Sequence, residues 1–256
     1  MSITKRHYIV TAIASYLLIL IITIPAKTVT GLFDTNTAVN LQGVNGTLWN
    51  GKARLISVNN TQLEKTTWSF NLLKLFIGKL SVDIHATYLG HVVRAELGSS
   101  FLGRYFVNDL QTRIPAEKVA KLINIPLAQL DGSISLDIQH AQWKQGELPL
   151  ASGEITWTNA TITVADTVSL GNINILLSES EQQLLFAEIK NQGGEIKITG
   201  SAELVPEAEY SVDITLSPAA GTNNNIKQSL GLFAKKQANG EYVFKQSGSL
   251  NQIMQL

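Results

Sequence analysis

The sequence of 256 residues contains no cysteine, which removes several kinds of chemistry at once. Disulfide bonds, thiolate metal sites and cysteine nucleophiles are all excluded. Charge is scarce as well, because 16% of the residues are charged and the 20 basic residues are balanced by 20 acidic residues. A nucleic-acid-binding protein normally carries a basic excess or a basic stripe. We therefore expect no nucleic-acid partner.

The familiar catalytic signatures are missing too. The sequence has no Gly-x-Ser-x-Gly elbow, no phosphate-binding loop and no dinucleotide fingerprint. The paired carboxylates Glu179 and Glu181 stand beside two glutamines, as solvated loop residues do. The histidines lack a convincing set of partner ligands; they are His7, His85, His91 and His140. We predict no catalytic, cofactor-binding or metal-binding residue and no enzyme activity.

A metal site at His85 and His91 is the alternative that the histidines leave open. These two residues flank a predicted turn at Gly90, and the nearest carboxylates in the sequence are those of Asp83 and Glu96. A metal ion would need these groups to converge on one point. Solvated positions on strands explain His85 and His140 more simply.

A long uncharged run is present at the start of the chain. It extends over 19 residues, from Tyr8 to Ala26, which is about the length that a helix needs to cross a bilayer. Lys5 and Arg6 precede it, so the positive-inside rule places the short N-terminus in the cytoplasm. We predict a cytoplasmic N-terminus over 1–7, a single transmembrane anchor over 8–26 and a β-rich domain outside the cytoplasm over 27–256.

A cleaved signal peptide is the competing interpretation of the same run. Cleavage after Ala26 would place Ile24 where a small residue is needed, and the run is longer than the apolar core of most signal peptides. The sequence favours an uncleaved anchor and leaves open whether the segment is ever cleaved.

Beyond the apolar run, apolar and polar side chains alternate, which is typical of strands with one buried face. Trp68 and Leu136 both fall on apolar positions of this pattern, so we expect both side chains in the core. Glycine-containing dipeptides indicate tight turns between the strands; they are Asn45-Gly46, Asn50-Gly51, Asp131-Gly132, Gly193-Gly194 and Asn239-Gly240. These signals predict antiparallel hairpins.

Two stretches are predicted to be helical. Pro115 suits the first turn of a helix over about 115–124, and Asn225 could cap a second helix that carries Ile226, Leu230 and Phe233. Because so little helix is available to cover many half-apolar strands, the sheet must fold over on itself or pack on another sheet. We predict a mainly β fold, with an antiparallel twisted or rolled sheet or sandwich and one or two short helices, preceded by the transmembrane helix.

The layout of the chain resembles the type II secretion system protein N family. The resemblance is carried by Gly46-Thr-Leu-Trp-Asn-Gly-Lys-Ala shortly after the anchor, a following strand with Trp68, the helix at Pro115, the strand Asp131-Gly-Ser-Ile and the closing Gly248-Ser-Leu. It implies a non-catalytic component of the bacterial inner membrane, with its β-rich domain in the periplasm. It also implies other type II secretion proteins as partners and a role in exporting folded periplasmic proteins across the outer membrane.

An AsmA-like periplasmic lipid-handling protein is the alternative function. An anchored, strongly alternating and rolled sheet could offer an apolar groove to acyl chains, so the sequence leaves lipid binding open. The apolar interior distinguishes the two hypotheses: normal packing density excludes a lipid, whereas a groove favours one.

Overall fold

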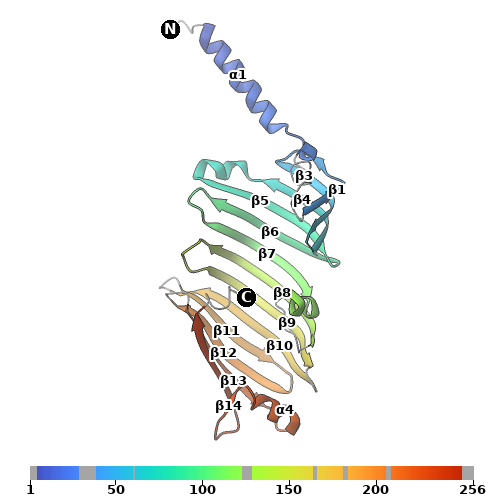
Figure 1. Cartoon of the computed structure of the whole chain (residues 1–256), viewed down its shortest axis with the longest axis vertical. Coiled ribbons are helices and arrows are strands. Elements are labelled where there is room, and N and C mark those ends of the chain that lie inside the picture. The colour runs from blue at the N-terminus through green and yellow to red at the C-terminus, as the bar shows by residue number, and fades with distance from the viewer. Residues whose placement is uncertain are drawn as a thin grey trace. The chain divides into compact units, whose positions relative to one another are not determined.

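The structure is a computed structural model that describes residues 5–28, 39–59, 61–122, 129–163, 166–180, 184–205 and 209–249 (Figure 1). The chain divides into two compact units, Met1–Val92 and Val93–Leu256. Strands predominate in both units, so the predicted mainly β fold is confirmed.

The first unit begins with a helix and continues as a small antiparallel sheet. Its elements are α1 (Lys5–Ile22), β1 (Val39–Gln42), β2 (Asn45–Gly46), β3 (Asn50–Val58), β4 (Thr61–Phe70), the 3-10 helix η1 (Leu72–Ile77) and β5 (Lys79–Tyr88). Its sheet has the order β1-β3-β4-β5, with β2 paired to β3. The register places Trp68 between Gly51 on one neighbouring strand and Ile84 on the other.

The second unit is a longer meander. Its elements are most of β6 (His91–Ser100), β7 (Tyr105–Pro115), α3 (Ala116–Leu122), β8 (Gln129–Trp143), β9 (Leu150–Thr163), β10 (Thr167–Glu179), β11 (Leu185–Gln192), β12 (Ile196–Val205), β13 (Glu209–Pro218), α4 (Asn224–Leu230), β14 (Lys235–Lys236) and β15 (Tyr242–Ser249). Consecutive strands are neighbours, except that β15 lies between β13 and β14. The described strands of this unit thus form one open antiparallel sheet rather than a sandwich of two sheets.

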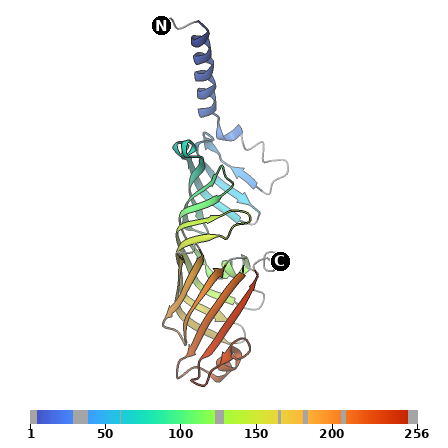
Figure 2. The ribbon, with the colours of Figure 1, turned by 90° about the vertical axis from the view of Figure 1, so that its left-hand side faces the viewer.

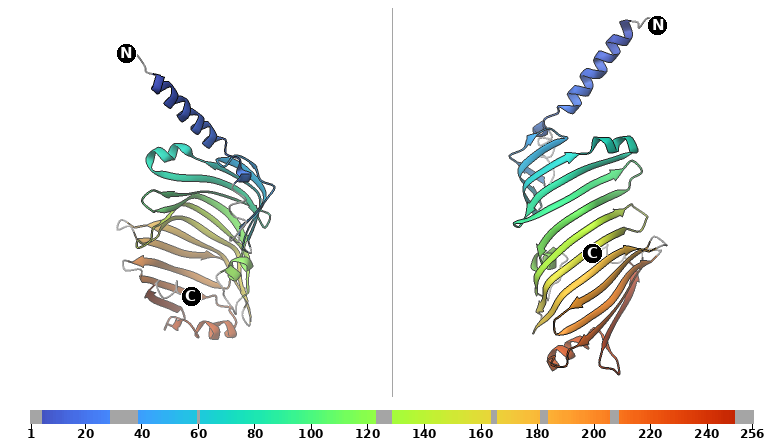
Figure 3. Two further views of the ribbon diagram at one scale, coloured as in Figure 1. Left: turned by 45° about the horizontal axis from the view of Figure 1, so that its top comes forward. Right: turned by 180° about the vertical axis from the view of Figure 1, so that it is seen from behind.

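Both predicted helices in the β-rich part are present. The first is α3, but Pro115 is the last residue of β7 rather than part of the first helical turn, and residues 123–124 of the predicted helix lie outside the described residues. Lys121 Nζ donates to Glu117 Oε1 at 2.6 Å across one turn of α3. The second is α4, but its cap is Asn223 rather than Asn225, because the Asn223 side chain accepts the backbone N–H of Asn225. Figure 3 shows α3 and α4 at the same end of the strands of the second unit.

The N-terminal helix ends earlier than the predicted anchor. The helix α1 stops at Ile22, whereas Ala26 is buried against Val44 and Ala53 of the sheet. The side chain of Thr23 donates to the carbonyl of Ile19 at 2.8 Å, which satisfies a carbonyl at the helix end. None of the helices within the described residues combines the length and the apolar character needed to cross a membrane. The anchor over 8–26 stays a prediction.

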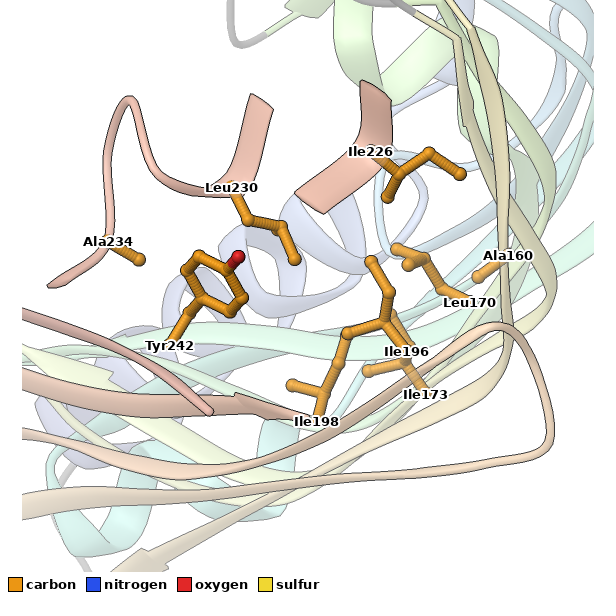
Figure 4. Close-up of a cluster of buried hydrophobic side chains, with 9 residues drawn as sticks. All are labelled: Ala160, Leu170, Ile173, Ile196, Ile198, Ile226, Leu230, Ala234 and Tyr242. Carbon is orange, nitrogen blue, oxygen red and sulfur yellow. The ribbon is translucent and has the colours of Figure 1, made fainter. Parts of the chain in front are cut away.

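The largest core lies in the second unit, between the end of the sheet and α4 (Figure 4). Strands contribute alternate side chains to one face, and the helix contributes Ile226 and Leu230, which are four residues apart and therefore share one helical face. The strand members, together with Ala234 just before β14, are Ala160, Leu170, Ile173, Ile196, Ile198 and Tyr242. Figure 2 shows α4 at the ends of the last strands.

A glycine at a bulge in β10 shapes this core. The pairing of β9 and β10 shifts register around Gly171, which has φ +71° and therefore lies in the left-handed region. A Cβ atom added there would collide with the backbone carbonyls of Gln192 and Gly193. The bulge turns Leu170 into the core beside the end of β11.

We expect Gly171→Ala to destabilise the protein by about 1–3 kcal/mol from the backbone conformation alone, with the collision adding to this cost. Gly146→Ala is the matched control, because Gly146 has φ +81° but nothing lies within 4 Å of its added Cβ. Thermal unfolding of the full-length protein, followed by circular dichroism, compares the two. Equal losses would show that the collision at Gly171 is relieved without cost.

Candidate functional site

A pocket opens beside the core of the second unit. It has a volume of about 260 Å³, and we call it the α4 pocket. Strands β9, β10, β12 and β13 and helix α4 supply most of its lining, and one residue before β10 and one after α4 complete it. The lining residues are Ile162, Asp166, Val168, Leu170, Ile196, Ile198, Leu216, Ile226, Ser229, Leu230 and Phe233. All but Asp166 and Ser229 are aliphatic or aromatic. The pocket can therefore hold an apolar group but offers almost no polar contact.

The floor of the α4 pocket is held by one asparagine. The ladder between β11 and β12 ends at the pair Lys190 and Thr199. Beyond that pair, the Asn191 side chain replaces the missing ladder: Oδ1 accepts the Ile198 N–H at 2.7 Å, and Nδ2 donates to the Ile196 carbonyl at 2.7 Å. Nδ2 also donates to the Leu170 carbonyl at 2.7 Å, so three strands are joined by one amide.

The helix that covers the pocket is fastened to the same region. Thr222 is buried just before α4, and its hydroxyl donates to the Glu195 carbonyl at 2.9 Å. The Ala219 N–H donates to the same carbonyl at 2.8 Å. The turn between β11 and β12 thereby sets the position of α4 over the sheet, which keeps the pocket open on a rigid support.

The entrance of the α4 pocket is partly apolar and partly polar. Phe233 is 57% exposed, and Asp166 and Ser229 are also exposed. Deeper in the pocket, Leu170, Ile196 and Leu230 are buried. The sequence predicted both Leu230 and Phe233 on the helix, but only Leu230 lies in α4, which ends there, and Phe233 follows it in a turn. The pocket itself could not be predicted, because the spacing of residues on α4 does not reveal which strands the helix covers.

The structure does not bring the histidines together into a ligand set. His85 is exposed on β5, and the described residues include no group of three histidine, aspartate or glutamate residues suited to a metal ion. His140 Nδ1 lies 2.6 Å from Asn108 Oδ1, and Asn108 Nδ2 donates to Glu96 Oε2 at 3.0 Å. This half-buried chain crosses three strands, so His140 is bonded within the sheet rather than simply solvated.

The predicted loop carboxylates and the carboxylates with shifted pKa values lie outside the α4 pocket. Glu179 is exposed at the end of β10, and Glu181 lies outside the described residues. Hydrogen bonds from Lys144 and then Arg104 lower the pKa of the exposed Glu147 carboxyl. A hydrogen bond from the Ser217 hydroxyl, followed by one from Asn239, lowers the pKa of Glu241. Hydrogen bonds to neighbouring surface side chains are thus the largest cause of both lowered pKa values, and neither carboxylate is part of a candidate catalytic site.

In the first unit, the element Gly46-Thr-Leu-Trp-Asn-Gly-Lys-Ala forms a small hairpin with a packed tryptophan. Gly46 has φ +94°, and a Cβ there would contact the Asn50 carbonyl at 2.6 Å. The Trp68 ring lies directly against Gly51, and its Nε1 donates to the Leu48 carbonyl at 2.9 Å. The glycines of this element therefore serve a tight turn and a close approach.

The same hairpin contacts the end of α1. Trp49 Nε1 donates to the carbonyl of Ile21 at 2.7 Å, and the Leu48 N–H donates to the carbonyl of Ile24 at 2.9 Å. The Trp49 ring packs edge-on against Phe70, with 5.7 Å between the ring centres. A helix C-terminus has unpaired carbonyls, and the Trp49 donor satisfies one of them. The bond from Leu48 joins the segment just after α1 to the same hairpin.

Comparisons with known proteins place this architecture in a family. A sequence model described as "Type II secretion system (T2SS), protein N" matches residues 37–245. The Type II secretion system protein N of Vibrio cholerae serotype O1 is 22% identical over 241 residues, covering 90% of this chain and 92% of that protein. The protein of the same name from Aeromonas hydrophila is 25% identical over 261 residues, covering 96% and 100%, respectively.

The protein of that name from Klebsiella pneumoniae is 23% identical over 210 residues, covering 80% of each chain. No solved structure matches the chain. The family match spans most of the sequence and includes both the hairpin with Trp49 and the strands and helix of the α4 pocket. The resemblance noted in the sequence is thus confirmed, and the chain belongs to the type II secretion system protein N family.

Proposed function

We propose that this protein is a non-catalytic component of the type II secretion system that supports the export of folded periplasmic proteins across the outer membrane. The observation that carries the proposal is the family match over residues 37–245, together with relatives that align over nearly the whole chain. The aliphatic lining of the α4 pocket agrees with binding rather than catalysis, since its polar side chains are confined to the entrance.

The proposed location is the inner membrane, with residues 1–7 in the cytoplasm, an anchor over 8–26 and residues 27–256 in the periplasm. The uncharged run and the preceding Lys5 and Arg6 support this orientation. Large apolar side chains such as Ile9, Ile13 and Ile19 are exposed on α1, and exposed apolar surface of this kind is better accommodated in lipid than in water. The bond from Trp49 to Ile21 would then hold the sheet close to the membrane surface.

We propose that partner proteins of the secretion system bind at the outer edge of β15. The short strand β14 covers only Val243 and Tyr242 of that edge. Among the residues that the structure describes, the stretch from Phe244 to Gly248 has a strand neighbour on one side, β13. An uncovered strand edge presents backbone donors and acceptors to which a partner strand can pair.

Affinity purification of the tagged full-length protein from membranes tests the secretion role. A photoreactive residue at Gln246 is irradiated before extraction, and bound proteins and lipids are identified by mass spectrometry. We expect other secretion-system proteins in the eluate, some of them cross-linked to position 246. Position 203 is the matched control, because Glu203 is exposed on β12, an interior strand with neighbours on both sides.

Absence of every secretion-system protein from the eluate would contradict the proposed role. Equal cross-linking from positions 203 and 246 would retain the role but reject β15 as the binding edge. Stoichiometric phospholipid without protein partners would instead favour the AsmA-like lipid-handling alternative, which gains support from one observation, the α4 pocket.

A further inference from the structure

We propose that the α4 pocket binds a single alkyl chain, such as the end of a lipid acyl chain, with its polar head outside in water. This inference is independent of the secretion role, because it depends only on the size, lining and backbone pairing of a pocket within the second unit.

The size of the α4 pocket suits one chain rather than a bulky ligand. Its volume is about 260 Å³. A dry apolar cavity of about 150 Å³ accommodates benzene, so by the same ratio this pocket takes roughly ten carbon atoms. It is therefore too small for a whole phospholipid and sufficient for part of one acyl chain.

The backbone around the α4 pocket disfavours a polypeptide as the occupant. Strands β10 and β12 each lie between two paired neighbours, so their backbone groups are bonded within the sheet. The Asn191 amide bonds the Ile196 carbonyl and the Ile198 N–H, which the ladder between β11 and β12 does not pair. A buried peptide would bring its own N–H and C=O groups into a lining without partners for them, which is costly. An alkyl chain carries no such groups, so the lining fits it without an unsatisfied polar atom.

The entrance indicates which head group is tolerated. Phe233 is exposed beside the opening, where its ring can cover the first carbons of an inserted chain. The carboxyl group of Asp166 also lines the entrance. An ionised carboxylate repels an anionic head and accepts hydrogen bonds from a hydroxyl, so a neutral alcohol should bind more tightly than the fatty acid of equal length.

Photolabelling of the full-length protein in membrane vesicles tests the proposal. The probe is decanol with a diazirine near the end of its chain, and labelled residues are mapped by mass spectrometry. We expect labelling of β10, β12 or α4 at the residues that line the pocket. Unlabelled decanol should compete with the probe, decanoate should compete less and butanol should not compete.

Two pairs of variants fill the pocket or add the same bulk elsewhere. Leu216→Phe places a bulkier aromatic side chain in the lining of the pocket. Leu176→Phe makes the same substitution on β10 at a residue that is 47% exposed and lies outside the pocket. Pocket labelling should fall at least about tenfold in the first variant, since two or three methylenes of the probe are displaced, and should persist in the second. Ser229→Trp against Gln228→Trp repeats the comparison at neighbouring exposed residues of α4.

If protease resistance shows that Leu216→Phe does not fold, the comparison of Ser229→Trp with Gln228→Trp tests the proposal instead. Equal pocket labelling in folded Ser229→Trp and Gln228→Trp would overturn the proposal. So would an absence of pocket labelling in the unaltered protein. Cross-linking from a photoreactive residue at position 229 to another protein, without labelling by decanol, would identify a partner side chain as the occupant and would also overturn it.

Discussion

Asn191→Leu is expected to lower the free energy of unfolding by at least about 3 kcal/mol, because it leaves three buried backbone groups without partners at about 1–3 kcal/mol each. Leucine branches at Cγ as asparagine does, so the change replaces the amide oxygen and nitrogen by two bulkier methyl groups, and the Asn174→Leu control carries the same increase in volume. The three groups are the Ile198 N–H and the carbonyls of Ile196 and Leu170, all of them bonded to the Asn191 amide at 2.7 Å. All three residues are buried.

Chemical denaturation of the full-length protein measures this loss, with the fluorescence of the four tryptophans as the signal. Asn174→Leu is the matched control on the neighbouring strand β10. The amide of Asn174 donates to Glu154 at an exposed position, where water can replace the lost bond. We expect a change within about 0.5 kcal/mol for the control, as for most surface substitutions. A similar small change for Asn191→Leu would mean that its three partners reach water or one another.

The alternation in the sequence correctly predicted much of the burial in the strands. On β4, Thr66 is buried and Trp68 half-buried, while Thr67 between them is exposed. The pattern was wrong at the start of β5, where Leu80 is 39% exposed and Ser81 only 1%. There the unforeseen helix η1 precedes the strand, and the Asn71 N–H donates to the Ser81 carbonyl at 3.0 Å, which places Ser81 beneath the turn.

Some of the glycine-containing dipeptides lie in the predicted hairpin turns, and others lie within strands. Gly193-Gly194 and Asn239-Gly240 do lie in hairpin turns, with positive φ angles at all three glycines. Asp131-Gly132 lies instead at a bulge inside β8, and Asn50-Gly51 opens β3. A glycine in the sequence indicates that the backbone needs conformational freedom or room for a close neighbour. The sequence does not say which neighbour, because groups such as the Trp68 ring against Gly51 come from another strand.

The α4 pocket and its support by Asn191 could not have been predicted by the same reasoning. Asparagine usually signals a turn or a cap, and here it replaces the end of a ladder between strands whose register is a long-range property. The spacing of Ile226 and Leu230 indicated an apolar helical face. Which strands that face would cover, and how completely, depends on the loop bond from Thr222 to Glu195 and on the bulge at Gly171.

Trp68→Ala is expected to destabilise the protein by about 3–5 kcal/mol, the usual cost of removing a large aromatic side chain from a core. The ring packs against Gly51 and the cluster of Ala26, Val44 and Ala53, and its loss also removes the donor to the Leu48 carbonyl. Gly51 has no side chain that could occupy the space that the ring leaves. Thermal unfolding of the full-length protein measures the effect.

Trp143→Ala removes the same side chain from a different setting and serves as the control. Trp143 is 45% exposed and stacks on Tyr105 with 5.8 Å between the ring centres. Its loss should cost only about 0.5–1.5 kcal/mol for the aromatic pair, plus the part of its surface that is buried. If Trp68→Ala costs no more than Trp143→Ala, the contact between the Trp68 ring and Gly51 does not stabilise the first unit.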